Sequence, residues 1–174
     1  MVLNTINKQY FQTEKLECFP CSLANLLVEM GENELAERVF NNYRNHSLVG
    51  KQGEMHIGTA TKLVLDLTNG LYESTLLFPG FGADLEQATE RFMPQRKEEI
   101  LEIVKEETEA GRIKVIDKNT KYDPLALVHV YNAGMGHWIV NIGNGKIIDN
   151  GQIVEVPLPF LNSITLSVLK IKKT

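Results

Sequence analysis

One stretch decides the fold of this 174-residue chain: residues 18–30, which read CFPCSLANLLVEM. Apolar side chains recur there at helical spacing, and Gly31 follows as a C′ residue that can end a helix. Pro20 suits the first turn of a helix, where its missing N–H costs nothing. The pattern therefore predicts a helix with two cysteines, Cys18 and Cys21, at its N-terminus.

Helical patterns continue through the first two thirds of the chain. Asn33 and Asp84 can each act as the N-cap of a short helix, and Pro94 suits the first turn of a longer amphipathic one. A further helix is expected at about 57–67, and residues 78–82 read as a loop. The part of the chain before about residue 111 is therefore predicted to be mainly helical.

The character of the chain changes after Gly111. Short runs of β-branched and apolar residues follow, separated by turns rich in glycine and asparagine. Strands are predicted at 113–116, 125–131, 137–142, 146–148, 153–156 and 164–171. We therefore predict an α+β fold in one domain, residues 1–174, with a helical half (about 1–111) packed on an antiparallel β-sheet (about 112–174).

Composition excludes several functional classes. Hydrophobic residues make up 43% and charged residues 23%, as in ordinary globular proteins. The net charge of −4 offers no basic face for nucleic acid. No secretion signal and no long apolar run is present, so we expect a cytoplasmic protein without a membrane partner.

The position of Cys18 and Cys21 favours nucleophilic chemistry. A helix N-terminus favours the thiolate through its free N–H groups and the macrodipole. A zinc site needs two more ligands at close spacing, and the histidines do not supply them. A thioredoxin-like dithiol is the closer rival, but the polar residues 9–17 do not form the buried strand that such a motif follows.

A cysteine nucleophile requires a base, and His137 is the best candidate among four histidines. It follows a run of small residues and begins a predicted strand, whereas His46, His56 and His129 have ordinary surroundings. The next hairpin returns Asp149 or Asn150 toward it, and either can orient the imidazole. Gln12, six residues before Cys18, can donate its side-chain amide to an oxyanion.

Taken together, these motifs resemble the papain-like cysteine peptidases that process the double-glycine leader peptides of bacteriocins. Gln12 and the run from Cys18 to Ala24 are similar to that family's glutamine and nucleophile helix. Gly136-His137-Trp138 and Ile148-Asp149 are similar to its histidine and aspartate strands. The resemblance implies a papain-like fold, the catalytic residues Cys18, His137, Asp149 and Gln12, a peptide or protein substrate, and no metal or organic cofactor.

The chain departs from the family pattern at Phe19, where the family usually has glycine. We expect this side chain to narrow the entrance to the site or to shield the thiolate. Residues from about Gly31 to Met93 match no motif of the family. An inactive binding or accessory module with the same fold is therefore the alternative function, ahead of a thiol-disulfide redox protein.

Overall fold

A computed structural model describes residues 10–12, 16–79, 85–116, 124–132 and 135–174. The helices are α1 (Cys18–Glu29), α2 (Asn33–Asn42), α3 (Ala60–Leu67), α4 (Leu85–Phe92), α5 (Lys97–Glu109) and α6 (Leu158–Ile164), with short 3₁₀ turns η1 (Tyr43–Asn45), η2 (Ile57–Thr59) and η3 (Pro94–Arg96). The strands are β1 (Tyr72–Pro79), β2 (Ile113–Ile116), β3 (Ala126–Asn132), β4 (Met135–Gly143), β5 (Lys146–Asp149), β6 (Gln152–Glu155) and β7 (Thr165–Lys173).

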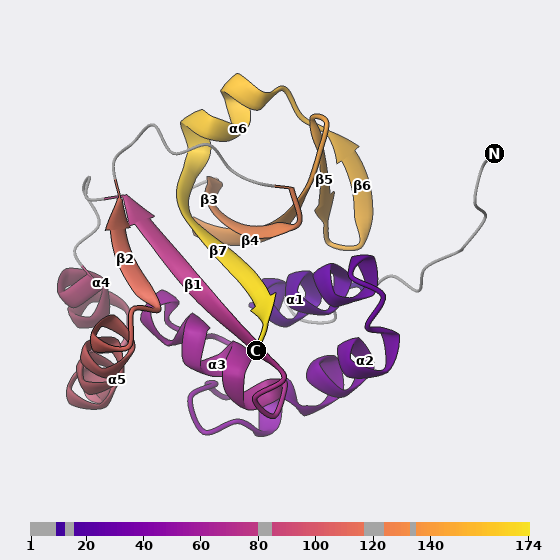
Figure 1. Cartoon of the computed structure of the whole chain (residues 1–174). Helices are drawn as coiled ribbons and strands as arrows, with labels where there is room; N and C mark the ends of the chain where they lie inside the picture. Colours follow the sequence, from indigo (N-terminus) through magenta and orange to yellow (C-terminus); the bar gives the residue numbers. More distant parts are fainter. Residues whose placement is uncertain (1–9, 13–15, 80–84, 117–123, 133–134) are drawn as a thin grey trace.

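The strands form one seven-stranded sheet in the order β2-β1-β7-β3-β4-β5-β6. From β7 to β6 all pairings are antiparallel. The hairpin turns predicted those from β3 to β6, whereas β7 pairs with β3 and β1 and not with the preceding strand β6. Figure 1 shows the strands crossing the molecule, with α1 to α5 below the sheet and α6 above it. The α+β prediction is confirmed.

The sheet differs from the prediction at β1. This strand comes from the helical half, pairs antiparallel with β7 and pairs in parallel with β2, so the sheet is mixed. Phe78 and Pro79 belong to it, although these residues read as the start of a loop. The prediction of a loop at Phe78 and Pro79 was wrong, because the proline and glycine residues nearby are typical of turns. Both residues lie instead in a strand that pairs with β2 on one side and β7 on the other. The candidate cap Asp84 lies outside the described residues.

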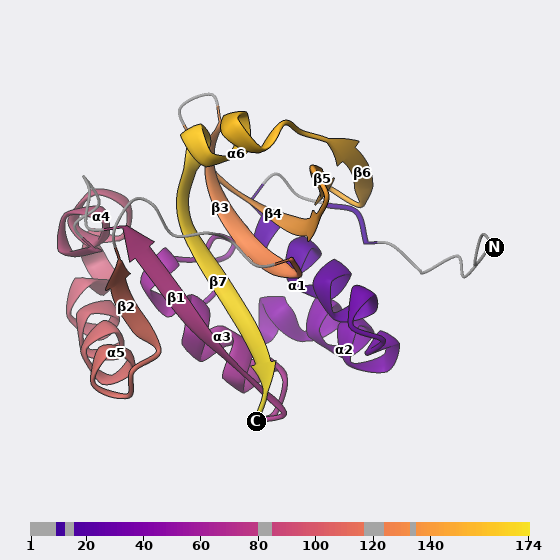
Figure 2. The same cartoon turned by 45° about the horizontal axis from the view of Figure 1, so that its top comes forward.

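Helix α1 lies at the centre of the larger core. Its side chains from Phe19 to Val28 are all buried, because α2 covers one side of the helix and the sheet covers the other. Strand residues of one face complete this core, among them Leu127, Trp138 and Leu169. The turned view in Figure 2 shows α1 behind β3 and β4. The stretch that predicted the fold therefore carries its most buried helix.

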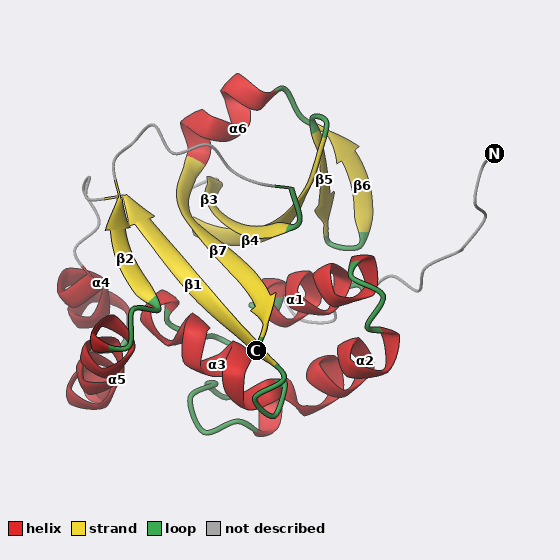
Figure 3. Ribbon diagram, viewed as in Figure 1, coloured by secondary structure: helices red, strands yellow, loops and turns green. Residues whose placement is uncertain are grey.

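A second, smaller core lies on the opposite face of the sheet. Val128, Val130 and Ile139 point there, alternating with the residues of the larger core, and Leu161 of α6 covers them. Figure 3 shows α6 as a helix set apart from the other five. Helix α6 was not predicted, because its seven residues include a proline and lie between two strands.

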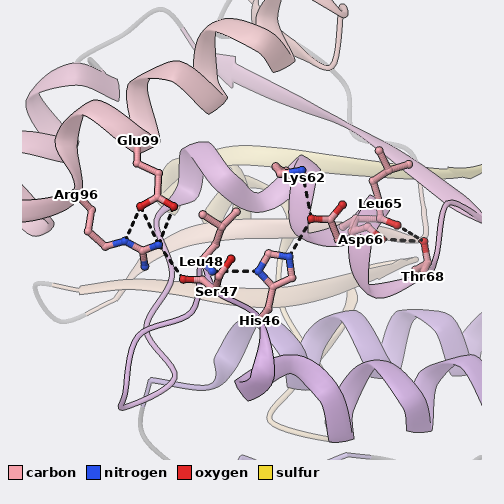
Figure 4. A network of polar contacts seen from close by, with 10 residues as sticks. His46, Ser47, Leu48, Lys62, Leu65, Asp66, Thr68, Arg96 and Glu99 are labelled. Atoms are coloured by element: carbon pink, nitrogen blue, oxygen red, sulfur yellow. Dashed lines mark hydrogen bonds and ion pairs between the residues drawn. The ribbon is translucent and has the colours of Figure 1, made fainter.

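The segment that matched no motif, about 31–93, is tied into the fold by a polar network (Figure 4). Asp66 of α3 accepts a hydrogen bond from His46 at 2.9 Å and forms an ion pair with Lys62 at 3.3 Å. Arg96 donates to Glu99 and also to the Ser47 carbonyl, at 2.8 Å. The network connects the loop after η1 to both α3 and α5.

Two buried histidines make the stability of the fold depend on pH. Burial lowers the pKa of His56 to about 4, and burial with the nearby charge of His137 lowers the pKa of His129 to about 4. Both side chains are neutral when folded. Between their folded pKa and the ordinary value near 6.5, the unfolded chain binds protons that the folded chain does not, so stability falls as the pH falls through this window.

We therefore expect acidification from about pH 7 to about pH 4.5 to lower the free energy of unfolding by several kcal/mol, since each histidine contributes up to about 3 kcal/mol. Urea titrations at stepped pH values measure this dependence. His129→Leu should make it shallower, because one of the two titrating groups is removed. An equally steep dependence in that variant would contradict the assignment.

Candidate active site

Cys18 is the first residue of α1 and is partly exposed. The preceding residue, Glu17, makes no side-chain cap hydrogen bond to the helix. Pro20 has no N–H and the Cys21 N–H donates to the Glu17 carbonyl, so the N–H groups of Cys18 and Phe19 are the first-turn donors that can face an anion, and the macrodipole adds its positive end. Arg44 binds the buried Glu17 carboxylate through Nε, which offsets a negative charge that would otherwise stand beside the thiol.

His137 and Asp149 lie on neighbouring strands of one hairpin. Val140 of β4 pairs with Ile148 of β5. His137 lies three positions from this pair on β4 and Asp149 one position from it on β5, so both side chains face the same side of the sheet. His137 Nε2 lies 2.6 Å from Asp149 Oδ1. The contact leaves Nδ1 as the ring nitrogen for another partner.

The electrostatics of His137 connect it to both neighbours. The hydrogen bond with Asp149 raises the pKa of His137 to about 9, a second hydrogen bond with Cys18 adds to the effect, and burial opposes it. His137 therefore keeps a proton near neutral pH, between a carboxylate and a thiol. The structure brings Cys18, His137 and Asp149 into contact, from α1, β4 and β5.

A polar side chain on the buried face of α1 helps to set this geometry. The Ser22 hydroxyl donates to the main-chain carbonyl of Trp138 at 2.8 Å. Ser22 lies one helical turn after Cys18, and Trp138 follows His137. The bond thus ties the helix that carries the thiol to the strand that carries the imidazole. Sequence reasoning missed Ser22; its signal was a small polar residue within an apolar helix.

Asn150 has a different partner from Asp149. Its Oδ1 accepts a hydrogen bond from the main-chain N–H of Gln12 at 2.6 Å. Of the two candidates left open by the sequence, Asp149 is therefore the one in contact with His137. Gln12 reaches the same turn of the chain through its backbone, beside Asp149.

Cys21 has different surroundings from Cys18. It is buried, and its thiol donates to the Tyr10 carbonyl at 2.9 Å. Burial raises the pKa of Cys21 to about 12, with the charge of Cys18 as the next cause. Cys21 is therefore a neutral hydrogen-bond donor. Among the residues that the structure describes, no three histidine, cysteine or acidic side chains gather as metal ligands.

Phe19 does not lie where the sequence placed it. Its side chain has no exposed area, and its ring contacts Trp138 edge-on at 5.2 Å and Tyr43 at 6.2 Å between centroids. A side chain without exposed surface cannot line an entrance. The expectation that Phe19 narrows access to the thiol was wrong. The residue lies on the side of α1 that faces the core, so its ring packs there and does not reach the surface.

The other three histidines serve elsewhere. His46 belongs to the network around Asp66, and His56 bonds the N–H of Gly58 and the hydroxyl of Thr89. The His129 ring packs against Trp138 at a tilt of 36°, with centroids 4.8 Å apart. His137 is the histidine that meets Cys18.

Comparisons with known proteins agree with this arrangement at the level of fold. No protein-family model and no curated protein matches the sequence. The peptidase domain of Streptococcus ComA, a bifunctional ABC transporter of a quorum-sensing pathway, matches with a TM-score of 0.52 and 16% identity over 97% of this chain and 99% of that domain. A double-glycine-motif protease from an AMS/PCAT transporter, solved with its leader peptide, matches with a TM-score of 0.52 and 16% identity over 96% of this chain and 91% of that one. The chain thus has the papain-like fold of these peptidase domains, and the predicted resemblance is confirmed.

Proposed function

We propose that this chain is a cysteine peptidase that works through a thioester acyl-enzyme. One observation carries the proposal: His137 contacts Cys18 and Asp149 together, at the N-terminus of a buried helix. A thiol, an imidazole and an orienting carboxylate in this order are the parts that thiol-dependent acyl transfer requires. The likeness of the fold to double-glycine peptidase domains supports a peptide substrate.

In this mechanism the proton of the pair resides on His137, and the Cys18 thiolate attacks the scissile carbonyl. The Gln12 side chain and the main-chain N–H of Cys18 stabilise the oxyanion. His137 then returns the proton to the leaving amine, and the thioester remains on Cys18. Water, deprotonated by His137, releases the acid, and Asp149 holds the imidazole in the required orientation throughout.

The buried position of Cys21 argues against the redox alternative. A dithiol enzyme needs a resolving thiol that can form the disulfide, and the Cys21 thiol is neutral and bound to the Tyr10 carbonyl.

The described residues include no helix long and apolar enough to cross a membrane. We propose a protein in the cytoplasm whose substrate is a peptide with a double-glycine motif.

Selective alkylation tests the proposal without a known substrate. We expect iodoacetamide to label Cys18 at about pH 6 at least about 10-fold faster than it labels glutathione, since a protonated imidazole beside a sulfur favours the reactive thiolate form. Cys21 should stay unlabelled in the folded chain. Intact mass and peptide mapping assign the site.

His137→Gln is the control variant, and it should bring the labelling rate of Cys18 down to that of glutathione. If Cys18 in the wild-type chain reacts no faster than glutathione, the enzyme proposal fails. An accessory module with a papain-like fold would then be the function to examine.

A further inference from the structure

The segment 10–12 is held by side chains from two distant parts of the chain. Asn25 of α1 forms a paired contact with the backbone of Tyr10: the Tyr10 N–H donates to Asn25 Oδ1 at 2.7 Å, and Asn25 Nδ2 donates to the Tyr10 carbonyl at 2.9 Å. Both residues are buried. The Asn25 carboxamide thus pairs with both the N–H and the carbonyl of Tyr10, as the backbone of a neighbouring strand does in a sheet.

Cys21 adds a third bond at the same residue. Its thiol donates to the Tyr10 carbonyl at 2.9 Å, and Asn25 Nδ2 lies 3.7 Å from its sulfur. Because burial raises the pKa of Cys21 to about 12, the thiol keeps the proton that it donates. One carbonyl therefore receives two donors from consecutive turns of α1.

The turn between β5 and β6 holds the other end of the segment. Asn150 Oδ1 accepts the Gln12 N–H at 2.6 Å. A Cβ at Gly151 would lie 2.6 Å from the Tyr10 carbonyl oxygen and 2.9 Å from the Phe11 ring, so the segment touches the turn where a side chain is absent. Asn150 and Gly151 both have positive φ, of 48° and 76°, which favours these two residue types.

The residue that precedes Asn150 is Asp149, which contacts His137, and Cys18 begins the helix that carries Cys21 and Asn25. The two anchors of the segment therefore lie on α1 and directly after β5, the elements that carry Cys18 and Asp149. We propose that Asn25, Cys21 and Asn150 form a clamp, and that this clamp positions Gln12 relative to Cys18 and so sets the oxyanion contact. The inference rests on the proposed peptidase function and assigns positioning roles to residues that do not take part in the chemistry.

Asn150→Gly tests the clamp, because glycine adopts positive φ without strain and removes only the acceptor. Asn144→Gly is the matched control: Asn144 also has positive φ, of 56°, in the neighbouring hairpin turn, and its side chain forms no hydrogen bond within the described residues. We expect the Gln12 amide to exchange with deuterium at least about 10-fold faster in Asn150→Gly and at an unchanged rate in Asn144→Gly.

Kinetics then tests the positioning role with a fluorogenic peptide amide that ends in Gly-Gly. Asn150→Gly should lower kcat by about 10-fold to 100-fold with little change in KM, since the oxyanion contact forms in the transition state. Alkylation of Cys18 by iodoacetamide develops no oxyanion, so its rate should not change. Asn150→Asp keeps the acceptor and should restore most of the turnover.

Gln12→Ala in the Asn150→Gly background should cost far less than Gln12→Ala alone, because both changes remove the same contact. Fully multiplicative losses would overturn the positioning role. So would a kcat equal to that of the Asn144→Gly control. Unchanged exchange at Gln12 would overturn the clamp itself, whether or not the chain is a peptidase. If wild-type Cys18 alkylates no faster than glutathione and no peptide is cleaved, the proposed function fails and the catalytic part of the inference with it.

Discussion

Peptide hydrolysis by this chain is expected to fall by at least about 10³-fold when Cys18 is replaced by alanine. The thiol is the group that would form the acyl-enzyme, and the chain's second thiol, that of Cys21, is buried and bound to the Tyr10 carbonyl. His137→Ala should cause a similar loss. The double variant should lose little more than either single one, because a nucleophile and its base act as a unit.

Initial rates with the fluorogenic Gly-Gly peptide measure this prediction. Cys21→Ser is the matched control, since its hydroxyl can still donate to the Tyr10 carbonyl; turnover should stay within about 10-fold of the wild type. Circular dichroism and the melting temperature show whether Cys18→Ala is folded. A folded Cys18→Ala variant with wild-type turnover would contradict the assignment of the nucleophile.

Phe19→Ala is expected to lower the free energy of unfolding by about 3–5 kcal/mol, the usual cost of truncating a buried aromatic residue. Phe19 is fully buried and contacts the rings of Tyr43 and Trp138, so the variant leaves a cavity between α1 and the sheet. Urea denaturation followed by tryptophan fluorescence measures the change, since Trp138 is the only tryptophan.

The same substitution at an exposed phenylalanine provides the control. Phe160 of α6 is 56% exposed, and Phe160→Ala should change the free energy of unfolding by no more than about 0.5 kcal/mol. If Phe19→Ala costs less than about 1 kcal/mol while the urea dependence keeps its slope, the ring does not fill the core as described.

Local patterns predicted most elements of the fold. The helix that begins at Cys18 was predicted because its apolar spacing and the glycine after it are local signals, and the antiparallel hairpins followed from their turn residues. Strand β1 was missed because what makes it a strand is its pairing with β2 and β7, about 40 and 95 residues further along the chain. Sequence periodicity carries no information on such partners.

The candidate site was accessible to sequence reasoning in part. Cysteine, histidine and aspartate have few roles in such positions, so their order along the chain was informative. Two points needed coordinates. The direction of the Phe19 side chain depends on how α1 rotates against the sheet, and the division of labour between Asp149 and Asn150 depends on which face of the turn each one occupies.

Strand β7 lies between β1 and β3, and this place in the sheet has a consequence for synthesis on the ribosome. Before residues 165–173 emerge, the pair β1–β2 and the meander from β3 to β6 have no strand in common. Each fragment then presents an open edge, β1 in one and β3 in the other, to any other nascent chain. The meander carries His137 and Asp149, so the contact between these two residues can form early. Its attachment to the rest of the sheet must wait for one late segment.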